Sequence, residues 1–343
     1  MLKRWKSNFL SREEFHSFKN SLQKFLNDKS FIVITPNNTG SNWLGVKNAT
    51  LSMYPKNTFV FPQYYSQPKL SPDQLLEFAN IVARSKIKLI ISSGTPAYIL
   101  EWIKLFQKTT IECGIIFHGG LAEMSYSENN RKNIKTIIEL GNKGYISKIG
   151  VVKDGLDSWF KRFSNCNVFR VVPGIELPKI ISYKKFNDGK FHIGVFGNSN
   201  YNKNRHTQVA AASLIKNSII HVLEPNEFDY GIPKERIVSH NNLNRNDFLS
   251  LLGSMNINLY CSFSESWGQV IIESLALGTP CIYSNNSGIS RIINSSKYLI
   301  NEYDNVISIA NKIENLLNDK NIDFNLKDFQ NRVKELNKKL LVN

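Results

Sequence analysis

Two glutamates, Glu265 and Glu273, are the residues whose type and spacing most clearly suggest chemistry. Around them the sequence predicts a buried strand over 257–261, a loop of small residues, an apolar helix over 269–277 and a second buried strand over 281–284. Gly278 supplies the left-handed stop of that helix and Pro280 prevents its continuation. A carboxylate on so apolar a helix is costly to bury unless something binds it, so Glu273 is predicted to have a partner. The alternative is that Glu273 occupies the one solvent-facing stripe of the helix.

The elements that position these glutamates alternate between strand and helix along the chain. Apolar runs alternate with segments of helical spacing, and the predicted strands cover 31–35, 58–61, 88–92, 113–117, 144–149, 168–172, 191–196, 219–223, 236–239, 257–261 and 281–284. This alternation predicts parallel sheets covered by helices on both faces. Pro173, Gly174 and the polar stretch 182–190 interrupt the pattern, which indicates a domain boundary there.

The length of 343 residues exceeds what one hydrophobic core usually organises, so two domains are expected. We predict an α/β fold with two Rossmann-like, doubly wound parallel-sheet domains that face a cleft, over 1–180 and 181–325. A C-terminal helix over 326–343 is predicted to pack back on the first domain. Ligands are then expected at the carboxyl ends of the strands.

The net charge of +15, from 43 Lys and Arg against 28 Asp and Glu, predicts an anionic binding partner or substrate. Nucleic acid, an anionic membrane surface and phosphate-bearing substrates are the candidates, and a compositional drift towards Lys, Asn and Ile is the alternative. Nucleic acid is disfavoured because the basic residues are spread over the whole chain and no helix-turn-helix, zinc or RNP-like motif is present. No apolar stretch approaches 18 residues and no secretion signal is found, so a cytoplasmic protein is predicted.

The first 27 residues predict a basic amphipathic helix, broken near Ser11. Its apolar side chains are Leu2, Trp5, Phe9, Phe15, Phe18, Leu22 and Phe25. One interpretation is that this helix packs on its own domain. The other is peripheral docking at the inner, anionic face of the membrane.

A family resemblance follows from the glutamate segment. S-E-S-W-G-Q-V-I-I-E-S-L-A-L-G-T-P, over 264–280, resembles the E-x7-E motif of retaining GT-B glycosyltransferases, particularly glycosyltransferase family 4. Other segments resemble the family in order, and they are V-V-P-G-I-E (171–176), F-H-I-G-V-F-G (191–197) followed by Lys203 and Asn204, and S-G-I (287–289). Asn198 stands where the family usually has arginine, with Arg205 as a substitute. The resemblance covers about residues 110–295 and implies a GT-B fold, in which the first domain (1–180) lies on the acceptor side and the second (181–325) binds the nucleotide sugar.

The resemblance also implies roles for individual residues. Departure of a nucleoside diphosphate develops negative charge, which lysine, arginine and the amides of a helix N-terminus can stabilise. Glu265 would contact the donor sugar, and Glu273 would accept hydrogen bonds from the ribose hydroxyls. His118, followed by two glycines at the end of a strand, would line the catalytic cleft.

The predicted site residues form three groups. The catalytic candidates are His118, Lys203 and Glu265. The donor-binding candidates are Asn198, Lys203, Arg205, His240, Glu265, Ser266, Trp267, Gly268 and Glu273. The acceptor-side candidates are Gly40, Ser41, Gly119 and Glu123.

The predicted function is transfer of a sugar, with retention of configuration, from a nucleotide sugar to a saccharide, a lipid-linked sugar, a polymer or a protein. The co-substrate would be a UDP- or GDP-sugar, and no metal or other cofactor is predicted, because the sequence lacks a D-x-D triad and clusters with ligand spacing. The alternative is a non-catalytic GT-B partner subunit that binds an acceptor for another glycosyltransferase. A nucleic-acid protein and an epimerase or hydrolase of the same fold are less favoured.

Overall fold

The computed structural model describes residues 9–37, 43–62, 70–96, 99–125, 127–178, 181–224, 228, 231–293, 295–319 and 323–338. The contacts within the chain define two compact units. Unit 1 comprises Met1–Gly119, Met124–Gly174 and Val333–Asn343, and unit 2 comprises Gly120–Glu123 and Ile175–Arg332. The assignment of an acceptor-side and a donor-side domain stays a prediction.

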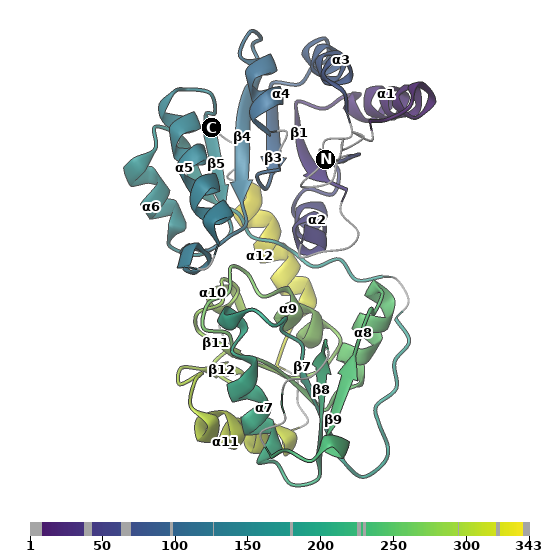
Figure 1. The fold of residues 1–343 in the computed structure, drawn as a ribbon, viewed down its shortest axis with the longest axis vertical. Coiled ribbons are helices and arrows are strands. Elements are labelled where there is room, and N and C mark those ends of the chain that lie inside the picture. Colours follow the sequence, from purple (N-terminus) through teal and green to yellow (C-terminus); the bar gives the residue numbers. More distant parts are fainter. Residues whose placement is uncertain are drawn as a thin grey trace, which may run out of the picture. The chain divides into compact units, whose positions relative to one another are not determined.

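Unit 1 contains a six-stranded, wholly parallel sheet in the order β2-β1-β3-β4-β5-β6 (Figure 1). Its strands are β1 (Phe31–Pro36), β2 (Thr58–Phe61), β3 (Leu89–Ser93), β4 (Glu112–Phe117), β5 (Lys148–Val151) and β6 (Asn167–Arg170). Its helices are α1 (Arg12–Leu26), α2 (Trp43–Met53), α3 (Pro72–Ala83), α4 (Ile99–Phe106), α5 (Glu128–Asn142) and α6 (Leu156–Phe163). Most strand residues are apolar and buried, as expected of a sheet covered on both faces, and the exposed ones, Glu112 and Asn167, are the first residues of β4 and β6.

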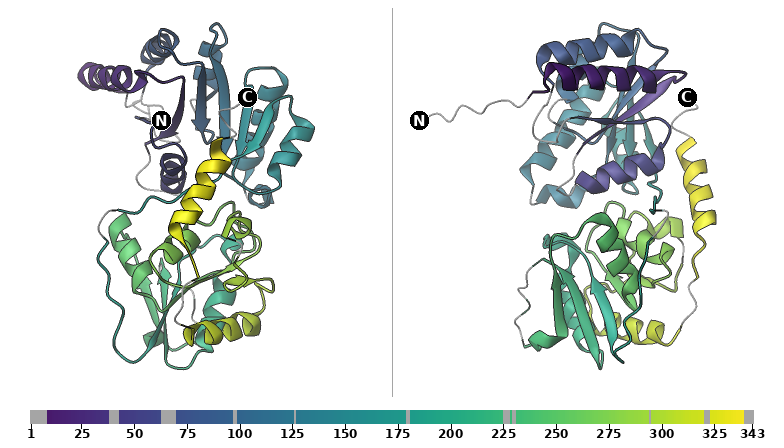
Figure 2. Two further views of the ribbon diagram at one scale, coloured as in Figure 1. Left: turned by 180° about the vertical axis from the view of Figure 1, so that it is seen from behind. Right: turned by 90° about the vertical axis from the view of Figure 1, so that its right-hand side faces the viewer.

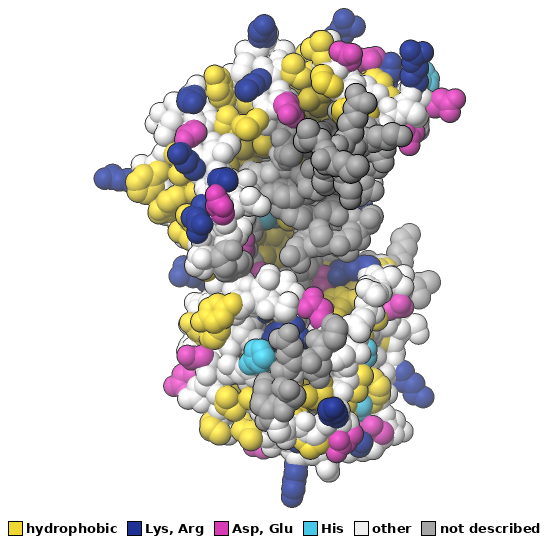
Figure 3. Space-filling view, viewed as in Figure 1, with side chains coloured by type: hydrophobic (Ala, Val, Ile, Leu, Met, Phe, Trp, Pro, Cys, Tyr) yellow, Lys and Arg dark blue, Asp and Glu magenta, His cyan; other side chains and the backbone are white. Residues whose placement is uncertain are grey.

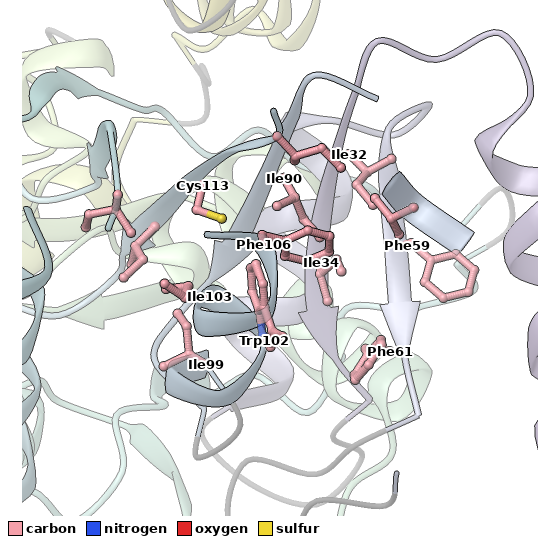
Figure 4. Close-up of a cluster of buried hydrophobic side chains, with 14 of the residues drawn as sticks. Ile32, Ile34, Phe59, Phe61, Ile90, Ile99, Trp102, Ile103, Phe106 and Cys113 are labelled. Atoms are coloured by element: carbon pink, nitrogen blue, oxygen red, sulfur yellow. The ribbon is translucent and has the colours of Figure 1, made fainter. Parts of the chain in front are cut away.

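The core of unit 1 is rich in aromatic side chains that the helices press onto the sheet. Trp102 and Phe106 of α4 lie beside Ile34, Ile90 and the other apolar side chains of the strands (Figure 4). The rings of Trp102 and Phe106 meet edge to face at 5.8 Å. This packing fixes the strands whose carboxyl ends carry polar side chains.

Ser11 is the N-cap of helix α1, and its capping box with Glu14 satisfies the first amides. It lies beside α3 (Figure 2), and Phe15, Phe18, Leu22 and Leu26 are buried in the core of unit 1. The apolar face of the described part of α1 is therefore already used in packing. Residues 1–8, with Leu2 and Trp5, lie outside the described residues.

Unit 2 contains a second six-stranded parallel sheet, in the order β12-β11-β10-β7-β8-β9. Its strands are β7 (Phe191–Val195), β8 (Ser218–Leu223), β9 (Ile237–His240), β10 (Ile257–Tyr260), β11 (Cys281–Ser284) and β12 (Leu299–Ile300). Its helices are α7 (Arg205–Ser213), α8 (Arg245–Ser254), α9 (Gln269–Ala276), α10 (Ser290–Ile293) and α11 (Val306–Leu317). Helix α7 connects β7 to β8, and α9 connects β10 to β11, so the two connections run from the centre of the sheet towards opposite edges. Because such connections are right-handed, the two helices cover opposite faces of the sheet.

Short turns and a final helix complete the described chain. The 3-10 turns are η1 (Leu121–Ser125), η2 (Tyr201–Lys203) and η3 (Lys234–Arg236). The final helix is α12 (Leu326–Lys338), whose last part belongs to unit 1. There Asn337 exchanges two hydrogen bonds with the backbone of Val172, at 2.8 and 2.7 Å.

Three elements differ from the sequence-based expectation. Helix α2 was not predicted, because its residues show almost no separation into apolar and polar faces. Strand β12 has only two residues, and α10 only four, so neither offers enough length for a periodic pattern. The predicted strands are confirmed with shifts of one or two residues at their ends, as is usual at element boundaries, except that the strand expected over 144–149 begins only at Lys148.

On the face shown in Figure 3, lysine and arginine side chains are scattered among acidic ones over each unit and form no single stripe. Among the residues that the structure describes, no helix has the length and apolar character needed to cross a bilayer.

Candidate functional site

The strand order of unit 2 creates a place where polar loops converge. Between β7 and β10 the order of the strands reverses, so the loops after these two strands diverge to opposite faces and leave a crevice. The loop after β7 carries Lys203, and the loop after β10 carries Glu265. Two residues 62 positions apart in sequence therefore reach the same edge of the sheet.

Lys203 and Glu265 form a largely but not fully buried ion pair at this edge, in which Lys203 Nζ donates to Glu265 Oε2. Tyr260 Oη donates to the same oxygen at 3.0 Å, and the Ser266 amide donates to Oε1 at 3.1 Å. Burial alone would raise the pKa of Glu265, but the Lys203 ammonium and these hydrogen bonds hold it below its ordinary value. Burial likewise works against the charge of Lys203, yet the Glu265 carboxylate raises the pKa of this ammonium. The pair is therefore charged on both sides.

The loop between β10 and α9 is fixed by close backbone contacts. Gly268 adopts the left-handed conformation (φ 99°) as the N-cap of α9 and makes no side-chain cap hydrogen bond. The Ile289 amide, in the turn over 287–289, donates to the carbonyl of Trp267 at 3.0 Å. Ser266 and Trp267 are buried. The predicted motif loop and the predicted turn after β11 are thus one packed unit.

Glu273 lies on α9 with a side chain that is 1% exposed, and its partner is Arg245 at the N-terminus of α8. Arg245 Nη2 donates to Glu273 Oε1 at 2.5 Å. Burial raises the pKa of Glu273, while Arg245 and a hydrogen bond from Gln269 oppose this rise. Further hydrogen-bond donors, such as vicinal hydroxyls, would stabilise the carboxylate. The prediction that Glu273 has a partner is confirmed.

Two predicted donor ligands make contacts away from the Lys203–Glu265 pair: Arg205 with the end of β8, and Asn198 within its own loop. Arg205 Nη2 donates to the carbonyl of Leu223 at 2.8 Å, and its guanidinium lies 3.6 Å from Glu224. Asn198 Oδ1 accepts a hydrogen bond from the Asn200 amide at 3.2 Å. Arg205 also lines a pocket of about 640 Å³ with Ser199, Asn200, Tyr201, Asn204, His206, Thr207, Glu224, Phe228 and Phe263. The structure therefore brings Arg205 to a pocket beside the Lys203 loop, and not into the Lys203–Glu265 pair.

His240, the last residue of β9, is half-buried and bonds through Nε2 to His221 Nδ1 at 2.9 Å. Burial lowers its pKa. Four residues further on, Asn244 caps α8, and Arg245 follows it. His240 is therefore close in sequence to the cation that binds Glu273.

Glu123, predicted on the acceptor side, belongs to unit 2. Ser266 Oγ donates to Glu123 Oε1 at 3.5 Å. Burial raises the pKa of Glu123, the Glu265 carboxylate raises it further, and Lys203 opposes both. Glu123 is thus part of the same electrostatic group as the Lys203–Glu265 pair.

His118 lies in unit 1, directly after β4, and Gly119 follows it. Its Nε2 is 2.7 Å from Ser93 Oγ, which is 2.5 Å from Thr50 Oγ1. Thr50 donates its only hydroxyl proton to the Val46 carbonyl at 2.7 Å, so Ser93 must donate to Thr50 and His118 Nε2 must donate to Ser93. Burial lowers the pKa of His118 to about 4, so the neutral ring offers Nδ1 as a hydrogen-bond acceptor.

The remaining acceptor-side candidates, Gly40 and Ser41, lie outside the described residues. Among the described residues, no group of three or more His, Cys, Asp or Glu side chains is arranged to hold a metal ion.

Sequence reasoning missed Arg245, Tyr260, Ser93 and Thr50. Arg245 leaves one detectable signal, because a cation in the first turn of a helix opposes the helix dipole and so suggests a partner elsewhere. The other three are ordinary strand and helix residues, and only their neighbours in space give them a role.

Comparison with known proteins was made on sequence and on structure. Residues 230–339, about a third of the chain, match the family model described as glycosyl transferases group 1. This segment includes His240, Arg245, Glu265 and Glu273. A search of curated proteins gave no match.

Several solved structures share the fold. Sucrose-phosphate synthase from Thermosynechococcus elongatus is 16% identical with a TM-score of 0.60, over 89% of this chain and 94% of that chain. Anabaena Alr3699/HepE in complex with UDP and glucose is 14% identical with a TM-score of 0.66, over 91% and 98%. A glycosyltransferase from Rickettsia africae is 14% identical with a TM-score of 0.59, over 92% and 100%.

These similarities confirm the predicted GT-B fold of two parallel six-stranded sheets with flanking helices. The family match over residues 230–339 supports glycosyl transfer as the activity class. Membership of glycosyltransferase family 4, and the role of the two glutamates as its motif, stay predictions.

Proposed function

We propose that this protein is a retaining glycosyltransferase that takes a sugar from a UDP- or GDP-sugar and transfers it to a saccharide, a lipid-linked sugar, a polymer or a protein. The observation that carries the proposal is the pair of glutamates eight residues apart, one partly and one fully buried and each bound to a cation, at the carboxyl edge of a Rossmann-like sheet. HepE, which shares the fold, is described in complex with UDP and glucose, which favours UDP over GDP.

In this proposal the nucleoside diphosphate binds unit 2. Glu273, held by Arg245, accepts hydrogen bonds from the ribose hydroxyls through its remaining lone pairs. The phosphates lie at Lys203 and at the amino end of α9, where Gly268 permits close approach of the backbone. Glu265 shares Lys203 with the phosphates and accepts from hydroxyls of the donor sugar.

The chemistry follows from these charges. As the bond from the sugar to the diphosphate breaks, negative charge grows on the phosphate, and Lys203 and the α9 amides are fixed in place to stabilise it. The acceptor hydroxyl passes its proton to the departing phosphate on the same face of the sugar, so the configuration at the anomeric carbon is retained. His118 offers Nδ1 as an acceptor for a sugar hydroxyl. Transfer is proposed to proceed without a divalent metal.

A titration of UDP and GDP into the protein in EDTA tests the binding step. Glu273→Ala should weaken nucleotide binding by about 1.5–3 kcal/mol, the range for a hydrogen bond to a charged group, or about 10- to 150-fold. Glu235→Ala is the matched control, because Glu235 is an exposed acid in the same unit. Equal affinity in the Glu273 and Glu235 variants would sink the assignment.

Proton NMR of the product formed from an α-linked donor in EDTA tests the chemical step. An α product supports retention without metal. A β product, or activity abolished by the chelator, contradicts the proposal.

The alternative, a non-catalytic partner subunit, is favoured by one observation. Lys203 and Arg205, the predicted phosphate ligands, are each bound to a glutamate of the protein itself. A partner subunit would bind a saccharide acceptor but neither bind nor hydrolyse nucleotide sugars. The same titration, followed by an assay for release of UDP or GDP, separates the two functions.

Cytoplasmic location and peripheral docking at an anionic membrane are further proposals. The burial of Phe15 and Phe18 in unit 1 favours packing as the role of the described part of α1. Docking would then depend on the basic residues and on the segment before residue 9.

A further inference from the structure

Three histidines form a continuous hydrogen-bonded chain across three adjacent strands of unit 2. His192 of β7 bonds through Nδ1 to His221 Nε2 of β8 at 2.8 Å, and His221 Nδ1 bonds to His240 Nε2 of β9 at 2.9 Å. At the other end, His192 Nε2 is 3.0 Å from Asp188 Oδ1. The Asp188–His chain, as we call these four residues, runs from a half-exposed carboxylate to the carboxyl end of β9.

The chain is built into the sheet. His192 and His221 are 4% and 3% exposed, and the ring of Phe186 stacks on His192 at 3.8 Å. His192 points to the same side of β7 as Phe196, whose ring meets Phe248 of α8. The chain therefore lies on the face of the sheet that α8 covers, and α8 begins with Arg245, the partner of Glu273.

The hydrogen bonds of the chain have one allowed direction when the rings are neutral. An ionised carboxylate only accepts, so His192 must carry its proton on Nε2 and present Nδ1 as an acceptor. His221 must then donate from Nε2 and accept at Nδ1, and His240 must donate from Nε2. Each neutral ring has a single N–H, and this N–H already donates to the next residue of the Asp188–His chain. His240 Nδ1 therefore carries no proton and presents a lone pair.

The electrostatics agree with neutral rings at the inner end of the chain. Burial, with the neighbouring His240 and His192, lowers the pKa of His221 to about 3, and burial lowers the pKa of His240. Hydrogen bonds from His192 and from the Lys190 amide lower the pKa of Asp188, which keeps its carboxylate ionised. Among the residues of the protein that the structure describes, no group lies within hydrogen-bonding distance of His240 Nδ1.

We infer that the Asp188–His chain fixes His240 Nδ1 as a hydrogen-bond acceptor for the nucleoside of the donor, where it receives an O–H of the ribose or an N–H of the base. This inference rests on the proposed function and deepens it. His240 is the contact residue, and Asp188, His192 and His221 are positioning residues that act through it. A proton added at His240 Nδ1 would reverse the direction of every hydrogen bond in the Asp188–His chain. Each ring would pass its Nε2 proton to the next residue towards Asp188, and His240 Nδ1 would become a donor.

The tautomers can be measured without any ligand. Nitrogen-15 NMR of the histidine rings at pH 8 should show His221 and His240 protonated on Nε2 and bare on Nδ1. Asp188→Ala should allow the reversed tautomer to appear at His240, and Asp188→Glu should restore the original one. Asp304→Ala, which removes an exposed carboxylate of the same unit, is the matched control. A wild-type His240 protonated on Nδ1, or an unchanged tautomer in Asp188→Ala, would overturn the inference.

The contact with the nucleoside is tested by titrating UDP into His240→Ala. A neutral hydrogen bond contributes about 1 kcal/mol, so affinity should fall about fivefold. Deoxy-UDP and N3-methyl-UDP identify the nucleoside group that donates the hydrogen bond to His240. The fivefold difference in affinity between the wild type and His240→Ala should vanish for the analogue that lacks this group. Asp188→Ala should weaken UDP binding in the same direction but less.

The outcomes also separate this inference from the proposed function. If the wild type binds no nucleotide, both the proposed function and the His240 contact are wrong. If the wild type binds UDP but His240→Ala binds it equally well, the contact alone is wrong and the proposed function stands.

Discussion

The centres of the two carboxyl edges differ in chemistry. In unit 1 the side chains at the ends of β3 and β4 are neutral, and Thr50, Ser93 and His118 are joined by hydrogen bonds, while the ion pair Arg170–Asp154 lies further along the edge, at β6. In unit 2 the edge is built from two ion pairs, Lys203–Glu265 and Arg245–Glu273. Both edges belong to parallel sheets of six strands, so the fold alone does not set this difference.

The two edges are suited to different ligands. Neutral donors and acceptors of fixed direction suit hydroxyl groups, whose protons can rotate to match them. Paired charges suit a ligand that carries both anionic oxygens and hydroxyls, since the ligand can share each cation and each carboxylate. A sugar acceptor at the edge of unit 1 and a nucleoside diphosphate at that of unit 2 fit this contrast.

The largest expected effect concerns the charged edge. Arg245→Ala leaves the buried Glu273 without its cation, and we expect the free energy of unfolding to fall by about 3 kcal/mol, because an uncompensated carboxylate remains inside. Chemical denaturation at pH 7 measures this loss. Arg332→Ala, at an exposed position of α12, is the control and should change stability little.

A second variant makes the reason for this loss testable. Arg245→Ala combined with Glu273→Gln should recover part of the stability, since the amide carries no charge to desolvate. A double variant as unstable as the sum of the two single variants would show that Arg245 acts by packing alone.

The Lys203–Glu265 pair should show strong coupling. In a double-mutant cycle of Lys203→Met and Glu265→Gln, we expect a coupling free energy of about 2 kcal/mol, because the two side chains are only 13% and 14% exposed. The i,i+4 pair Lys132–Glu128 on α5, with both side chains more than two-thirds exposed, should couple by less than about 0.5 kcal/mol. Equal coupling in the two pairs would contradict the buried, charged character of the site.

The neutral edge should respond to acid. The pKa of His118 is lowered to about 4 in the folded protein, below the ordinary value of 6.5, so the unfolded chain takes up the proton first. Stability is therefore lost as the pH falls from about 6.5 to about 4, by about 1–2 kcal/mol between pH 7 and pH 5. Denaturation of the wild type and of His118→Asn at both pH values measures this, and the variant should lose less. An identical loss in both proteins would show that His118 is not held neutral.

The smallest effect is expected at the surface. Because Phe15 and Phe18 are buried, vesicle binding through α1 would rest on its basic residues, and we expect weak co-sedimentation with anionic vesicles that disappears at high salt. Neutral vesicles are the control. Binding that persists at high salt and is lost on deleting residues 1–10 would instead indicate apolar insertion by that segment.

The two parallel sheets and the segment around Glu273 could be predicted from the sequence. Buried strands and amphipathic helices have distinct periods, and a glutamate among six apolar neighbours stands out without any knowledge of the fold. The sequence could not predict α2, whose residues do not separate into two faces, or β12, which pairs with β11 over only two residues.

The partner of each polar group in the site could be found only from the three-dimensional structure. Arg245 and Glu273 are 28 residues apart, Lys203 and Glu265 are 62 apart, and His192 and His221 are 29 apart. A partner at such distances depends on which strands are neighbours and on their register, and periodicity along the chain contains neither. For the same reason Arg205, which the sequence offers as an equal of Lys203, binds Glu224 instead, because its side chain leaves the first turn of α7 towards the end of β8.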